Sequence, residues 1–76
     1  MTFNQLRKDV IAIARIVYGE KYKIEMKALK KQTDRTSASY ALKLYKEFRD
    51  YLRQCYKESQ PPNTFKQFMK AKKEGK

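Results

Sequence analysis

Residues that interrupt helices are scarce in this sequence and stand at only three places. Its two prolines are adjacent, Pro61 and Pro62, and its two glycines are Gly19 and Gly75. Long stretches without either residue favour a few uninterrupted helices over many short strands, which would need frequent turns. Gly19 can adopt the left-handed conformation that ends a helix, and the Pro-Pro pair cannot continue one. The sequence therefore predicts an all-α fold.

Apolar side chains recur at helical spacing in most of the chain and set the bounds of the expected helices. These bounds are about residues 3–18, 24–32, 37–58 and 64–73. The first and the last helix each begin with Thr-Phe-x-Gln. In such a capping box the threonine hydroxyl accepts a hydrogen bond from a free amide, and the glutamine side chain accepts one from the backbone of the threonine. We expect a single domain, residues 1–76, that folds as a small compact bundle of three to four helices.

The less regular parts of the chain lie between these helices and after the last one. Residues 20–32 alternate partly as in a strand, but no second strand is present to pair with them, so a short helix is favoured. The Asp and Thr residues of 33–36 are expected to cap the helix that follows. Residues 70–76 are rich in lysine and are expected to fray into a basic tail.

The expected third helix is the most clearly amphipathic segment. The side chains that its apolar face would bury are Ala41, Leu44, Tyr45, Phe48, Tyr51, Leu52 and Cys55. In the first helix the corresponding stripe consists of Phe3, Leu6, Val10, Ile13, Ala14 and Val17. Ile11 and Ile16 fall outside that stripe, so the first helix is expected to pack on more than one side.

The net charge is unusually high for so small a domain. The chain has 19 Lys and Arg residues against 8 Asp and Glu residues, which gives a formal net charge of +11. This excess opposes folding through self-repulsion, so it indicates that the protein works against an anionic surface. Nucleic acid phosphate is the commonest such surface. An acidic protein surface and anionic lipid are the alternatives.

The residue types that carry out catalysis or bind metals are mostly absent. The chain has no histidine, and its one cysteine, Cys55, has no histidine to activate it. We therefore expect no enzymatic activity, no metal site and no cofactor. A single cysteine and a chain without a secretory leader or a membrane-spanning run indicate a cytoplasmic protein that does not bind membranes.

Residues 26–45, MKALKKQTDRTSASYALKLY, resemble the helix-turn-helix of many DNA-binding proteins. Leu29 matches the buried position of the first helix of that motif, and Asp34 stands at the turn. Tyr40 and Leu44 match the buried positions of the second helix. The resemblance implies that exposed residues near the start of the third helix face the major groove of duplex DNA.

The candidate nucleic-acid-binding residues follow from this resemblance and from the neighbouring basic residues. They are Lys27, Lys30, Lys31, Arg35, Ser37, Ser39, Leu42, Lys43, Lys46 and Arg53. Leu42 lies on the polar side of the third helix, where it can touch a thymine methyl group or be a lone exposed leucine. The expected function is that of a regulatory or accessory DNA-binding protein, as in transcription or in a mobile element.

Two other partners are compatible with the same charge. An acidic protein could dock on a surface whose hydrophobic centre is made by Leu42, Tyr56, Ile11 and Ile16 and whose rim is basic. Single-stranded nucleic acid could stack on exposed tyrosines, for which Tyr56 is the best candidate. The sequence leaves open whether the protein forms a homodimer.

Overall fold

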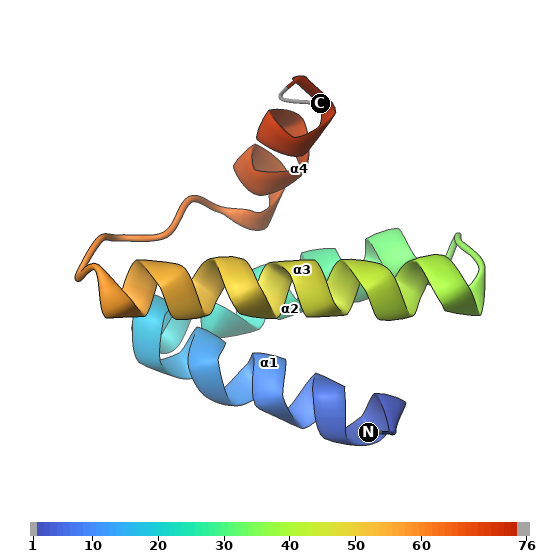
Figure 1. The fold of residues 1–76 in the computed structure, drawn as a ribbon, viewed down its shortest axis with the longest axis horizontal. Coiled ribbons are helices and arrows are strands. Elements are labelled where there is room, and N and C mark those ends of the chain that lie inside the picture. The colour runs from blue at the N-terminus through green and yellow to red at the C-terminus, as the bar shows by residue number, and fades with distance from the viewer. Residues whose placement is uncertain (1, 75–76) are drawn as a thin grey trace.

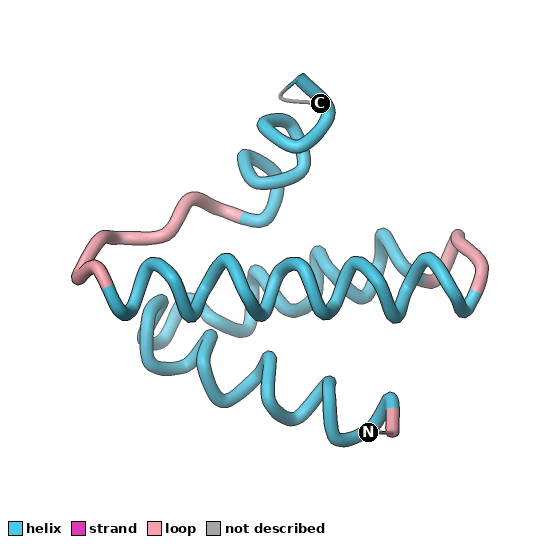
Figure 2. Tube along the Cα trace, viewed as in Figure 1, coloured by secondary structure: helices cyan, strands magenta, loops and turns pink. Residues whose placement is uncertain are grey.

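A computed structural model describes residues 2–74 and confirms the all-α fold (Figures 1 and 2). The helices are α1 (Phe3–Tyr18), α2 (Tyr22–Thr33), α3 (Ala38–Lys57) and α4 (Phe65–Glu74), and a single turn of 3-10 helix (Gly19–Lys21) joins α1 to α2. Each α-helix lies within two residues of its predicted bounds. Residues 70–74 are helical and not frayed, and residues 75 and 76 of the predicted tail lie outside the described part of the chain.

The first three helices form a bundle around one core, and α4 packs aromatic side chains against this core. Figure 1 shows α3 crossing the molecule, with α1 along its lower edge and α2 behind it. Helix α2 runs in the opposite direction to α1 and α3. An extended connection leads from α3 to α4, which stands on the other side of α3 from α1 in this view. The Cα radius of gyration is 11.7 Å, close to the ~11 Å expected for a compact domain of this length.

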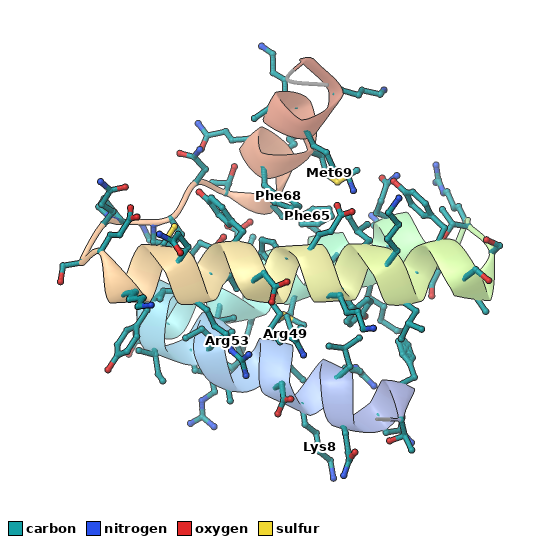
Figure 3. The ribbon with its side chains drawn as sticks, viewed as in Figure 1. Lys8, Arg49, Arg53, Phe65, Phe68 and Met69 are labelled. Carbon is teal, nitrogen blue, oxygen red and sulfur yellow. The ribbon has the colours of Figure 1, made fainter. Side chains whose placement is uncertain are left out.

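The centre of the core is the ring of Phe48. It is fully buried, and its centroid lies 5.3 Å from that of Phe65 and 5.1 Å from that of Phe68. Figure 3 shows Phe65, Phe68 and Met69 extending from α4 toward α3. The other fully buried large side chains are Leu6, Val10, Leu29, Leu44 and Leu52. Because these residues come from α1, α2 and α3, the amphipathic stripes of all three helices share one apolar interior.

The helix ends confirm the predicted capping box in full at α4 and in its threonine half at α1, but not the predicted cap of α3. Thr2 Oγ1 accepts from Gln5 N (3.2 Å), and Gly19 ends α1 with φ +66°. At α4 the capping box is reciprocal, because Gln67 N donates to Thr64 Oγ1 (3.2 Å) and Thr64 N donates to Gln67 Oε1 (3.0 Å).

The cap of α3 is not one of residues 33–36, as predicted, but Ser37. Its Oγ accepts from Tyr40 N at 3.2 Å. Thr33 is the last residue of α2, and its hydroxyl donates back to Leu29 O (3.0 Å), while the Thr36 hydroxyl donates to Thr33 O (3.0 Å). These two threonines therefore stabilise the end of α2 and leave the start of α3 to the serine.

Two tyrosines hold the connection between α3 and α4. The Tyr18 hydroxyl donates to Asn63 O (2.6 Å), and Asn63 N donates to the Tyr51 hydroxyl (2.7 Å). Burial is the main cause that raises the pKa of Tyr18 well above its usual range, and the nearby Glu25 carboxylate adds to it. Burial also raises the pKa of Tyr51, although its hydrogen bond with the Asn63 backbone acts the other way.

The raised pKa of Tyr18 makes stability depend on alkaline pH. The unfolded chain loses this phenolic proton near pH 10, whereas the folded protein still keeps it, so the free energy of unfolding is expected to fall as pH rises above ~10. Tyr18→Phe cannot ionise and should show a shallower fall. Urea unfolding at about pH 8 and about pH 10.5 measures the difference. Tyr56→Phe, at a ring that is 60% exposed, is the control. If the free energy of unfolding of Tyr18→Phe fell with pH as steeply as that of the parent protein, the prediction would be contradicted.

Candidate nucleic-acid interface

All ten candidate nucleic-acid-binding residues lie on the surface. Each is exposed, including Leu42 at 37%. Within residues 2–73, none of the cationic side chains among them forms an ion pair with an acid. Their positive charges therefore remain available to an external anion.

Some of the acidic side chains, by contrast, are engaged within the described part of the protein. Glu47 pairs with Lys72, and Asp50 pairs with the neighbouring Arg49 at 3.3 Å. Glu25 is buried, and its Oε1 accepts from Phe65 N at 2.7 Å.

One group of candidates lies along the outward face of α3. At 100° per residue, positions 39, 43, 46, 50, 53 and 57 fall within an arc of about 80°, opposite the buried stripe. This face therefore also contains one acid, Asp50, which pairs with Arg49 at its border. Lys43 and Lys57 are 14 residues apart, so this face presents cations over ~21 Å of helix. Figure 3 shows Arg53 and Arg49 extending from α3 toward α1, which places Arg53 at the edge of the face nearest to α1.

The structure does not bring all candidates on α2 to that face. Lys31 and Arg35 line a groove between α2 and α4, together with Lys66. Lys30 lines a separate hollow beside Arg7 at the start of α1. Lys27 lies on the exposed side of α2 away from the core. The predicted site is therefore divided among α3, the groove between α2 and α4, and the outer side of α2.

Individual positions refine the predictions for polar and aromatic side chains. The Ser37 hydroxyl is engaged as the cap of α3, whereas Ser39 lies on the outward face of that helix. Tyr45 is buried, and Tyr51 is half-buried, which confirms that both belong to the core. Tyr56 is 60% exposed, as expected for the best candidate for base stacking.

Two features escaped the sequence-based reasoning. The first is Glu25, the buried partner of α4, whose burial the lysines beside it in the sequence do not indicate. The second is the groove between α2 and α4, whose apolar residue Ile24 is 65% exposed. The available signal for this groove was the position of Ile24. It alternates with Tyr22, Met26 and Ala28 and falls outside the stripe that a helix of these residues would bury.

Two kinds of feature, a metal-binding cluster and a membrane-spanning helix, are absent from the described part of the chain. Within residues 2–74, no group of three or more His, Cys, Asp or Glu side chains is arranged to hold a metal ion. No helix in that range combines the length and the apolar character that crossing a membrane requires.

Comparisons with protein-family models, with curated proteins and with solved structures found no match to this chain.

Proposed function

We propose that this protein binds duplex DNA, with the outward face of α3 as the main contact and Lys31 and Arg35 on flanking phosphates. The observation that carries the proposal is the row of exposed, unpaired cations on α3 in a protein of net charge +11. Lysine acts as a point charge and reads little sequence, so phosphate attraction should contribute most of the affinity. The resemblance to helix-turn-helix proteins supports the same partner. A role as a regulatory or accessory factor follows from this proposal.

The geometry of α3 is compatible with the major groove. The groove of B-form DNA is about 12 Å wide and admits one α-helix. Helix α3 is 20 residues long, and Figure 1 shows no other element in front of it. Lys43, Lys46 and Arg53 would reach phosphates or guanine edges, and Leu42 would lie beside them to contact a thymine methyl group.

Lys43 and Lys46 provide the test of this proposal. Replacing both with alanine should weaken binding to a random duplex and reduce the dependence of log K on log salt by about 1.8, because each lost phosphate contact contributes about 0.9. Helicity should stay unchanged, since both side chains are exposed and unpaired. Fluorescence anisotropy over a salt titration measures the slope, and circular dichroism measures helicity.

The matched control removes two lysines elsewhere. Lys21 and Lys23 are also exposed, and they lie at the start of α2, away from the α2–α3 turn. Their double alanine variant loses the same charge and should change the slope by much less. Equal effects of the two double variants would reject α3 as the interface. Binding by the parent protein that does not respond to salt would reject nucleic acid as the partner.

A further inference from the structure

A groove between α2 and α4 has an apolar floor that no element of the described chain covers. Its volume is about 630 Å³. On α2 the floor is made by Ile24 and Ala28, one helical turn apart, and on α4 by Phe65 and Met69, also one turn apart. Ile24 is 65% exposed, the highest value among the large apolar side chains noted on the surface. A monomer gains nothing from an exposed isoleucine above an apolar floor, so this floor indicates a binding surface.

The rim of the groove is cationic. Lys31 and Arg35 stand on the α2 side, and Lys66 stands on α4. A second hollow of about 470 Å³ continues the groove, because Gln32 and Met69 line both. The cations that line this continuation are Lys70, Lys72 and Lys73.

The groove contains almost no negative charge of its own. The one acid in the lining of either hollow is Glu25, and its carboxylate is already bound to Phe65 N. Of the lining cations in the described residues, Lys72 alone is paired, with Glu47. The surface therefore combines an apolar strip with a surplus of unpaired positive charge, and its complement is a ligand with an apolar strip flanked by negative charge.

Three kinds of occupant could fill the groove, and its lining favours one of them. A second copy of the chain in the same groove would bring Lys31, Arg35 and Lys66 against identical cations, which opposes a symmetric dimer. Single-stranded nucleic acid needs exposed rings for stacking, but the floor is mainly aliphatic and Phe65 is only 3% exposed. An amphipathic helix supplies an apolar stripe with side chains at i, i+3 or i+4 and i+7, flanked by polar positions that can carry acids, and this matches the apolar strip of Ile24, Ala28 and Met69 with its cationic rim.

We propose that the groove between α2 and α4 binds an acidic amphipathic helix of a partner protein. Leucine-like side chains of that helix would pack on Ile24, Ala28 and Met69, and its flanking carboxylates would pair with Lys31, Arg35 and Lys66. This inference goes beyond duplex binding and does not depend on it, because the apolar strip of the groove is separate from the outward face of α3; Lys31 and Arg35 are the residues that both proposals use.

The experiment uses the whole protein and a synthetic probe. The probe is a fluorescent peptide of about 16 residues, with leucines at positions i, i+4, i+7 and i+11 and glutamates on both flanks. A peptide of the same composition but with the leucine stripe scrambled is the reference for charge alone. The striped peptide should bind, and backbone amide chemical shifts should change most at residues that line the groove. Equal affinity for the scrambled peptide would overturn the proposal.

Two isoleucines offer a matched pair of variants. Ile24 is 65% exposed and lines the groove, whereas Ile16 is 60% exposed on α1 and does not. Glutamine at either position keeps the charge and suits an exposed helix. Ile24→Gln should weaken peptide binding by roughly tenfold, because the buried apolar area of an anchor is lost. Ile16→Gln should leave binding within about twofold. Equal affinities of the two variants would overturn the assignment.

The outcome is separable from that of the duplex experiment. The Lys43→Ala, Lys46→Ala protein should bind the peptide as the parent does, and the Ile24→Gln protein should bind duplex as the parent does. A single-stranded oligothymidine is the competing probe. If it bound the parent protein and lost about tenfold in affinity with Ile24→Gln, the groove would belong to nucleic acid and the proposal would be overturned.

Discussion

Replacing Phe48 with alanine is expected to lower the free energy of unfolding by about 3–5 kcal/mol. The Phe48 ring is fully buried and contacts the rings of Tyr18, Tyr51, Phe65 and Phe68. Truncating such a ring costs about 3–5 kcal/mol, from lost transfer free energy and from the cavity that remains. A domain of this size has a total stability of about 4–11 kcal/mol, so the loss removes between roughly a quarter and all of it.

Urea denaturation followed by circular dichroism measures this loss. The parent protein should give one cooperative transition, and Phe48→Ala should shift its midpoint to much lower urea or remove the folded baseline. Tyr56→Ala is the matched control, since it truncates an aromatic residue of the same helix that is 60% exposed, and it should change stability by less than about 1 kcal/mol. A loss below about 1.5 kcal/mol for Phe48→Ala would show that this ring is not the centre of the core.

Glu25→Ala is expected to cost about 1.5–3 kcal/mol. The Glu25 carboxylate accepts a hydrogen bond from Phe65 N inside the protein, which joins α2 to the first turn of α4. A carboxylate near a helix N-terminus is also stabilised by the helix dipole. Removing it leaves the buried Phe65 N–H without a partner, and a lost hydrogen bond to a charged group costs an amount of this size.

The comparison with glutamine isolates the hydrogen bond from the charge. Glu25→Gln keeps an oxygen acceptor, so its loss should be about half that of alanine. Glu20→Ala, at an exposed acid just before α2, should stay within about 0.5 kcal/mol of the parent. Hydrogen exchange provides a local measurement, because the amides of α4 should lose protection before those of α1. Equal stability of the Glu25 and Glu20 alanine variants would contradict the prediction.

Much of the fold could be predicted because its signals are local. The helix bounds, the caps at Thr2 and Thr64 and the turn at Gly19 depend on residues a few positions apart. The predicted cap of α3 was one residue away from the observed one, because Ser37 and the threonines before it have similar hydroxyls. Only the folded turn shows that Thr33 and Thr36 donate back to α2.

The candidate site was predicted less completely. Exposure of the ten candidates could be anticipated from the helical period, since each lies off an apolar stripe. Their grouping could not, because it depends on how α2 and α4 are placed relative to α3. Lys31 and Arg35 are near α3 in the chain but share a groove with Lys66, more than 30 residues away. Spacing along one helix contains no information on such a neighbour.

The amino-acid sequence by itself determined the helices, their buried faces and the surplus of positive charge. These properties follow from side-chain periodicity, from capping and from composition, all of which act within a few residues or over the whole chain. Only the tertiary structure decided that Glu25 is buried against a residue 40 positions away, and that an apolar groove with a basic rim remains open between α2 and α4. The physical reason is that both features arise where separate helices meet, and packing of the common core sets that meeting.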